Sequence, residues 1–208
     1  LLLRKPVRLF YGDADGDDVM ELAEGFADTG TKQWKPIRKL DVFAKTFPQV
    51  RGMFTRNKAF AASSLPKIIG PAFRDMKSVE IRTLSSTVFL NKTGRFEMRA
   101  LPDAAQFSPA FGLCAEDLDG DGLADLFLAQ NDFSVPERHS RYDSGRGLLL
   151  RGDGTGNFTA MPASESGIVL HGKQCGVVAV DFNDDGQPDL AVSQRSVATW
   201  LFLRRKTN

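Results

Sequence analysis

Short apolar runs alternate with turn residues along much of the chain. Apolar and β-branched runs at 158–162, 176–182, 189–194 and 198–204 are separated by turn residues, a pattern typical of short strands. Four antiparallel strands in each repeating unit form the blade of a β-propeller. The pattern therefore predicts an all-β fold of about three four-stranded antiparallel blades.

A different pattern interrupts the strands between 36 and 76. Leu40, Phe43 and Phe47 are spaced for one face of a helix, and Pro48 then interrupts that helix. Ser64 is placed to begin a second short helix. We expect 36–76 to form a basic, mostly helical insertion.

An acidic loop recurs along the chain. The residues DLDGDGLAD at 117–125 return as DFNDDGQPD at 181–189, an offset of 64 residues, and more loosely as DADGDDVME at 13–21. The similarity continues past the loop, since Gln130 matches Gln194. Periods of this length indicate propellers and other repeat architectures, in which each unit buries its apolar face against its neighbours.

The spacing within the loop predicts a metal site. Asp at positions 1, 3, 5 and 9 brings several oxygen atoms to one point, and Gly at positions 4 and 6 permits a left-handed backbone. The backbone carbonyl of position 7 can add a ligand. Sets of oxygen ligands rich in carboxylates suit Ca²⁺, which accepts about six to eight, better than Mg²⁺, which keeps more water. The predicted ligands of the three loops are Asp13, Asp15, Asp17, Val19 and Glu21; Asp117, Asp119, Asp121, Leu123 and Asp125; and Asp181, Asn183, Asp185, Gln187 and Asp189.

The first loop is the least regular, and none of the loops is an EF-hand. Asp18 replaces the second Gly of the first loop, and Glu21 replaces its last Asp. An EF-hand needs a bidentate Glu at position 12, where the second and third loops have Leu128 and Val192. Only Glu24 of the first loop fits, and the flanks are strand-like. EF-hands are therefore excluded.

These motifs resemble a known family. Acidic loops between strands, a period near 60 residues and the turn at 148–158 that ends in Gly-x-Phe are similar to FG-GAP/VCBS repeats, the blades of integrin-α-like propellers. Stretches at 106–125, 146–158 and 164–167 resemble more narrowly the bacterial secreted proteins of the cartilage-acidic-protein type. The resemblance covers nearly the whole chain except the insertion. It implies that the three loops hold up to three Ca²⁺ ions through the residues named above.

The number of blades predicts a larger assembly. Propellers close with about four to eight blades, more than this chain supplies. The chain also begins at Leu1 without Met and ends inside a turn. We therefore expect residues 1–208 to be part of a longer propeller, with 36–76 inserted within it.

Charge and composition narrow the possible partners. The formal net charge is +1, yet 31–100 holds 15 Lys and Arg against 4 Asp and Glu, and 13 of the 26 carboxylates lie in the three loops. The basic excess predicts a solvated helical face, because no nucleic-acid-binding motif accompanies it. No apolar run reaches the roughly 18 residues of a membrane helix. Cys114 and Cys175 are expected to be isolated core thiols rather than a disulfide.

Two functions remain open from the sequence. The first is a secreted, periplasmic or cell-surface propeller, stabilised by calcium and non-catalytic, that binds a protein or carbohydrate ligand in adhesion. The alternative is a propeller-fold enzyme acting on polysaccharide, a lyase or hydrolase. Calcium loops favour the first, since only the polar segment 131–147, with Arg138, His139 and Arg141, offers pieces of a catalytic or ligand-binding group.

Overall fold

Antiparallel β-sheets form most of the regular structure, with a small helical insertion. The computed structural model describes residues 6–135 and 141–205, and the chain divides into two compact units, Leu1–Leu84 and Ser85–Asn208. Every strand pair among the described residues is antiparallel. No described helix is long and apolar enough to cross a membrane.

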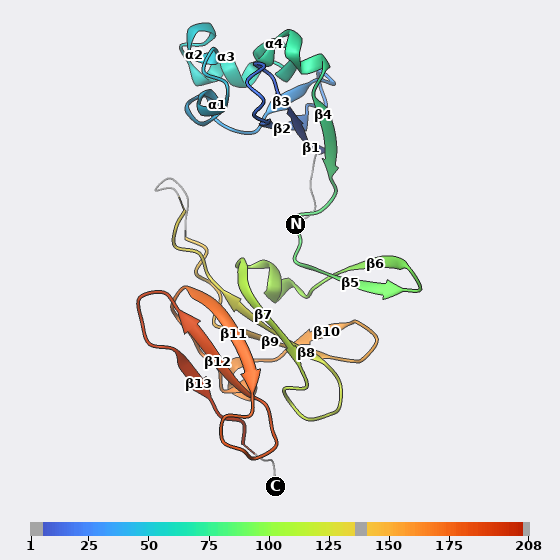
Figure 1. Cartoon of the computed structure of the whole chain (residues 1–208), viewed down its shortest axis with the longest axis vertical. Helices are drawn as coiled ribbons and strands as arrows, with labels where there is room; N and C mark the ends of the chain where they lie inside the picture. The colour runs from blue at the N-terminus through green and yellow to red at the C-terminus, as the bar shows by residue number, and fades with distance from the viewer. Residues whose placement is uncertain (1–5, 136–140, 206–208) are drawn as a thin grey trace. The chain divides into compact units, whose positions relative to one another are not determined.

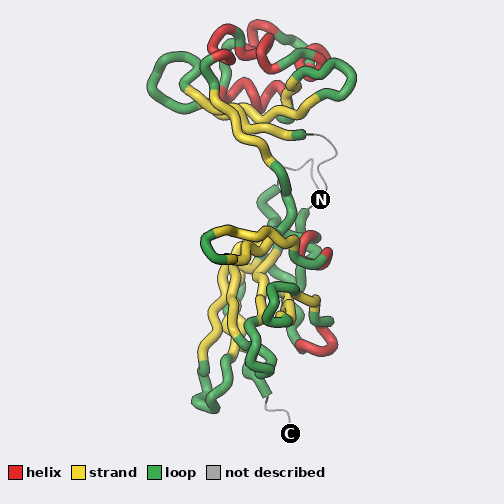
Figure 2. The backbone as a smooth tube through the Cα atoms, turned by 90° about the vertical axis from the view of Figure 1, so that its right-hand side faces the viewer, coloured by secondary structure: helices red, strands yellow, loops and turns green. Residues whose placement is uncertain are grey.

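The first unit is a four-stranded sheet with helices on one face (Figure 2). Its strands are β1 (Val7–Gly12), β2 (Glu21–Ala27), β3 (Trp34–Pro36) and β4 (Lys77–Ile81), in the order β3-β2-β1-β4. Its helices, all between β3 and β4, are α1 (Leu40–Thr46), α2 (Val50–Met53), α3 (Asn57–Ala62), α4 (Leu65–Ile69) and the 3-10 helix η1 (Pro71–Arg74).

Aromatic side chains join these helices to the sheet. Phe10 of β1 belongs to one buried cluster with Phe43, Phe47 and Phe60. The Phe43 and Phe47 rings stack at 4.8 Å between centroids, as their spacing on one helix face predicts. Ser64 precedes α4 as its N-cap residue, but its side chain makes no capping hydrogen bond.

The second unit contains a hairpin and two packed sheets (Figure 1). Its first elements are β5 (Thr87–Lys92), β6 (Arg95–Ala100) and the 3-10 helix η2 (Asp103–Gln106). A four-stranded sheet follows, in the order β10-β9-β8-β7, from β7 (Ala110–Glu116), β8 (Asp125–Gln130), β9 (Leu148–Gly152) and β10 (Phe158–Ala160). After the short helix α5 (Ala163–Ser166), a three-stranded sheet contains β11 (Gln174–Val180), β12 (Asp189–Gln194) and β13 (Trp200–Phe202).

One strand assignment from the sequence is wrong. The run at 158–162 does form a strand, β10, but it pairs with β9 and not with the last sheet. The last sheet therefore has three strands among the described residues. The first unit differs again, because β4 pairs with β1, at the edge opposite β3.

The 64-residue repeat is visible in the backbone of the second unit. In β7 the pairing register shifts between Ala110 and Gly112, and in β11 it shifts between Gln174 and Gly176, 64 positions later. Such a bulge adds a residue to one strand and locally increases its twist.

The two sheets of the second unit bury a common core. Phe127 and Leu149 of the first sheet share a buried cluster with Leu190 and Val192 of the second. Cys114 is half-buried beside this core, whereas Cys175 is exposed, and both are free thiols. The expectation of two core thiols is therefore wrong for Cys175, because the bulge turns this residue outward.

Candidate metal sites

Each acidic loop connects two neighbouring antiparallel strands. The loops join β1 to β2, β7 to β8 and β11 to β12. The Asp at position 1 follows the first strand, and the acidic residue at position 9 is the first residue of the second. The pairing of the two strands therefore brings the two ends of each loop together.

The position-1 carboxylate accepts two backbone N–H groups of its own loop in all three loops, from positions 4 and 6 in the first two loops and from positions 5 and 6 in the third. Gly16 N–H donates to Asp13 Oδ1 at 2.6 Å, and Asp18 N–H donates to its other oxygen at 3.0 Å. In the second loop, Gly120 and Gly122 donate to Asp117 at 2.6 and 3.0 Å. In the third, the N–H groups of positions 5 and 6 donate to position 1 at 3.1 and 2.7 Å.

Positions 5 and 9 also repeat their contacts. The position-5 Asp accepts the N–H of position 7 at 2.8, 2.8 and 2.9 Å in the three loops. The position-9 carboxylate accepts the N–H of position 2 at 2.6, 3.1 and 3.0 Å. The contacts of positions 5 and 9 are therefore the same in three separate sequences.

Backbone hydrogen bonds and burial set the charge of these carboxylates. The N–H of Gly16 lowers the pKa of Asp13, and the N–H of Gly186 lowers that of Asp181. Burial and the neighbouring Asp17 raise the pKa of Asp15. Burial raises the pKa of Asp125, with the N–H of Gly152 opposing it. The first and third loops thus favour the charged form at position 1, whereas burial disfavours it at Asp15 and at Asp125.

Two of the loops bring three carboxylates within reach of one cation. Oxygen atoms of Asp13, Asp15 and Asp17 lie within 4.8 Å of one another, and so do those of Asp117, Asp119 and Asp125. The first group is exposed; in the second, Asp125 is fully buried and the other two are half-buried. These oxygen donors fit a hard divalent cation. The third loop has Asn183 at position 3, so its set includes an amide oxygen.

The other predicted ligands lie at positions 5, 7 and 9 of the loops. Glu21 is 7% exposed and Asp189 1% exposed, and each begins its strand. The position-5 residues Asp17, Asp121 and Asp185 accept the N–H groups of position 7, which belong to Val19, Leu123 and Gln187. Ligation by their carbonyl groups stays a prediction.

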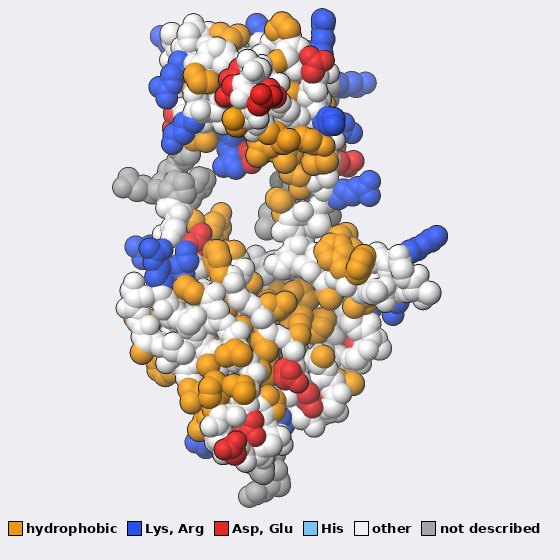
Figure 3. All heavy atoms as spheres, in the orientation of Figure 1, with side chains coloured by type: hydrophobic (Ala, Val, Ile, Leu, Met, Phe, Trp, Pro, Cys, Tyr) orange, Lys and Arg blue, Asp and Glu red, His pale blue; other side chains and the backbone are white. Residues whose placement is uncertain are grey.

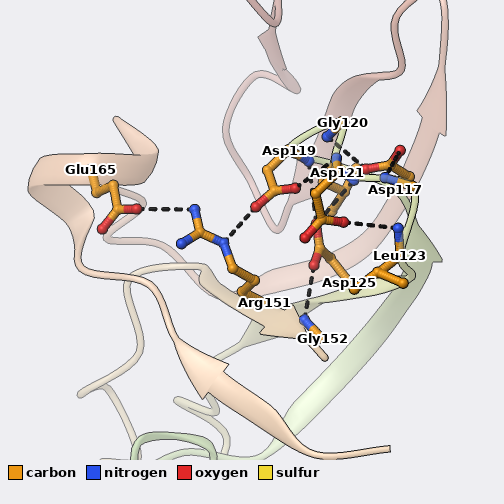
Figure 4. Close-up of polar contacts among 11 residues, drawn as sticks. Asp117, Asp119, Gly120, Asp121, Leu123, Asp125, Arg151, Gly152 and Glu165 are labelled. Carbon is orange, nitrogen blue, oxygen red and sulfur yellow. Dashed lines mark hydrogen bonds and ion pairs between the residues drawn. The ribbon is translucent and has the colours of Figure 1, made fainter. Parts of the chain in front are cut away.

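The second loop is tied to the next strand, β9, by contacts that the sequence did not predict. Gly152 N–H donates to Asp125 Oδ1 at 2.9 Å, and Arg151 Nε donates to Asp119 Oδ2 at 2.5 Å (Figure 4). In the third loop, Arg204 N–H donates to Asp189 Oδ1 at 2.8 Å. The 64-residue repeat does not relate Gly152 to Arg204, which are 52 positions apart, so no signal in the sequence pointed to these contacts.

The described residues of the segment 131–147 make contacts inside the second unit. Asn131 is fully buried, and its Nδ2 donates to the carbonyls of Gly145 and Gly172 at 2.9 and 3.0 Å. Asp132 pairs with Lys173 at 2.8 Å, which lowers the pKa of that carboxyl. These residues hold the segment in place. Arg138 and His139 lie outside the described residues.

Comparison with known proteins locates the repeat in the second unit. Residues 117–192 match the FG-GAP-like repeat family, a stretch that begins at the second acidic loop and ends in β12. No curated protein and no solved structure matches the chain. The second unit therefore carries an FG-GAP-like repeat, of the kind that builds β-propeller folds.

Proposed function

We propose that the three loops bind Ca²⁺ and that the chain is a non-catalytic binding scaffold. The observation that carries this proposal is the hydrogen-bond pattern of positions 5 and 9, which recurs in 13–21, 117–125 and 181–189. A surface turn selected only for solubility would not need the carboxylates of positions 5 and 9 on the same N–H groups in three sequences.

Calcium suits these loops better than magnesium. Each loop offers four acidic or amide side chains and one backbone carbonyl, close to the ligand number that Ca²⁺ prefers. Mg²⁺ needs a near-ideal octahedron and gives up its water reluctantly. A bound ion would supply the positive charge that offsets the clustered carboxylates. The position-1 and position-9 side chains would then connect the two strands of each hairpin through that ion.

The calcium proposal leads to an extracellular setting. Extracellular calcium modules bind at about 10⁻⁴–10⁻³ M, far above cytosolic free calcium. Sites of that affinity would fill only outside the cytoplasm. We therefore place the protein in the secreted, periplasmic or cell-surface group, near the bacterial secreted proteins of the cartilage-acidic-protein type. Its rigid blades would present loops to a protein or glycan ligand in adhesion.

Thermal unfolding in EDTA and in millimolar calcium tests the proposal. Ligand that binds only the folded state adds about 2.7 kcal/mol per site at a hundredfold excess over Kd, so calcium should raise the unfolding temperature and magnesium should raise it much less. A variant with Asp13→Ala, Asp117→Ala and Asp181→Ala should lose the response. Identical curves for the parent chain in EDTA and calcium would contradict calcium binding.

A further inference from the structure

Arg151 forms an unusual contact with the second acidic loop. Its Nε donates to Asp119 Oδ2 at 2.5 Å, and its Nη2 donates to Glu165 Oε1 of α5 at 3.0 Å. Figure 4 shows the guanidinium between the two carboxylates, on the side of Asp119 away from Asp117. The Arg151 side chain is 46% exposed and that of Asp119 is 18% exposed. Asp119 is also one of the three carboxylates grouped for a cation.

The third loop lacks both members of this pair. Leu126 pairs with Leu150 in one sheet and Leu190 pairs with Phe202 in the next, so Leu203 occupies the place of Arg151. The equivalence holds at the following residue, where Gly152 and Arg204 make the same N–H contact.

The two repeats differ in one negative and one positive side chain, and these two differences cancel in net charge. The third loop has Asn183 where the second has Asp119. The loop with the additional carboxylate is therefore the loop that Arg151 contacts; the guanidinium of Arg204 also lies against this loop, beside Gly120.

A cavity beside Arg151 gives its side chain room to move. The cavity measures about 840 Å³ and is lined by Asp119, Arg151, Glu165, Arg204 and apolar side chains that include Met161. A guanidinium that leaves Asp119 would remain next to Glu165 and in contact with solvent. The surrounding side chains therefore do not force Arg151 to stay on Asp119.

We propose that Arg151 is a displaceable counter-ion of the 117–125 loop, which competes with calcium for Asp119 and lowers the affinity of this loop for the ion. This inference rests on the proposed calcium function. The guanidinium contacts Asp119 in a loop that carries four carboxylates, so it stabilises the ion-free loop more than the ion-bound loop, where a divalent cation would repel it. Any group that stabilises the free state more than the bound state weakens binding by the same ratio.

Calcium titration of Arg151→Leu tests the inference, because Leu is the residue that the next repeat uses. The titration is done in a chain with Asp13→Ala and Asp181→Ala, so that only the second loop responds. Arg151→Leu should bind calcium about fivefold more tightly at low salt, and the gain should shrink as salt screens the charges. In EDTA the same variant should unfold at a lower temperature. Arg151→Lys keeps the positive charge and should stay near the parent affinity. Arg195→Leu changes the net charge by the same amount in the turn after β12, and it should leave the calcium affinity unchanged.

A transplant into the third loop keeps the inference testable if Arg151→Leu does not fold. With the first two loops disabled by Asp13→Ala and Asp117→Ala, Asn183→Asp should tighten calcium binding. Adding Leu203→Arg should return the affinity toward that of the parent loop.

The outcomes separate the two proposals. A parent chain that binds no calcium overturns the proposed function and this inference with it. A parent that binds calcium, with Arg151→Leu binding equally or more weakly, overturns the inference alone, and so does a transplant in which Leu203→Arg has no effect.

Discussion

At the scale of single residues, each acidic loop turns through two backbone positions with positive φ. They are Gly16 and Asp18 in the first loop, Gly120 and Gly122 in the second, and Asp184 and Gly186 in the third. Asp18 takes φ of 65° and Asp184 takes φ of 58°. Asp tolerates the left-handed region better than most residues but less well than Gly. Only the second loop has Gly at both positions.

Replacement of Gly122 by Ala should isolate this conformational requirement. Gly122 has φ of 83°, and a Cβ there would meet nothing within 4 Å, so Gly122→Ala should cost about 1–2 kcal/mol through backbone strain alone. Gly52, in α2, is also unobstructed but has no positive φ. Gly52→Ala should therefore stabilise its unit by about 0.5–1 kcal/mol.

Fluorescence can follow these two changes separately, since each unit holds one of the two tryptophans, Trp34 and Trp200. Urea unfolding would use a Trp34→Phe background for Gly122→Ala and a Trp200→Phe background for Gly52→Ala. A loss of stability at both positions would contradict the conformational explanation.

Asp28 should make the first unit sensitive to acid. Thr31 donates to Asp28 Oδ1 through its N–H at 2.7 Å and its hydroxyl at 2.9 Å, and Lys35 lies 3.3 Å from the other oxygen. These contacts, with Thr31 as the main cause, lower the pKa of Asp28 to about 2. Because the folded pKa is depressed, the contribution is present above the unfolded value near 4 and is lost as pH falls through about 2.

The comparison with Asp28→Asn isolates that contribution, since Asn cannot titrate. The difference in unfolding midpoint between parent and variant, measured by Trp34 fluorescence in EDTA, should be complete at about pH 5 and should disappear as the pH falls below about 2. A difference independent of pH would show that the charge of Asp28 is not involved.

At the scale of elements, the packing of β7 against β11 depends on two glycines of unequal importance. A Cβ on Gly112 would lie 2.9 Å from the Cα of Gly176 and 3.2 Å from the Cβ of Ala129. A Cβ on Gly176 would meet only Ser193 Oγ, at 3.3 Å. A side chain at Gly112 would therefore collide with backbone, whereas a side chain at Gly176, the equivalent position of the next repeat, would meet only one serine hydroxyl.

Gly112→Ala should accordingly destabilise the second unit by about 1–3 kcal/mol, as overpacking of a tight core does. Gly176→Ala should cost less than about 1 kcal/mol, because a serine hydroxyl can rotate away. Urea unfolding of both variants in the Trp34→Phe background measures the difference. Equal losses would mean that the two sheets do not approach each other as described.

Strand positions were predictable from the sequence, but sheet membership was not. Alternating apolar positions and turn residues locate β11 and β12 to within two residues at each end, since the signal is local. The partner of β10 depends on which edge is free after the chain has folded, which local pattern does not encode. The pairing of β4 with β1 was missed for the same reason, because about 65 residues separate them.

At the scale of the whole molecule, the candidate sites were predictable because their ligands are close in sequence. Positions 1 and 9 of each loop are eight residues apart, and the N–H groups that hold them are in the same loop apart from those of Gly152 and Arg204. Arg151 was not predictable as a loop contact, because it comes 32 positions after Asp119 and reaches it only through the pairing of β8 with β9. Sites whose ligands lie within one short loop can be predicted from the sequence, whereas contacts between residues that only strand pairing brings together cannot.

The three sites should differ in affinity, with the first loop weakest. Its grouped carboxylates are all exposed, and Glu21 must lose more rotamer freedom than Asp to reach an ion. Asp13→Ala should therefore remove the weakest calcium-binding step and leave the other two steps unchanged. Loss of the tightest step in that variant, measured by calorimetry, would reverse the ranking.

Calorimetric titration of the parent chain with calcium tests the calcium assignment most directly. The chain should bind close to three equivalents of Ca²⁺ with dissociation constants near those of extracellular modules, about 10⁻⁴–10⁻³ M, and should bind Mg²⁺ much more weakly. Absence of saturable calcium binding up to millimolar concentrations would contradict the account. Dissociation constants below about 10⁻⁷ M at every site would retain the metal sites but contradict the extracellular setting.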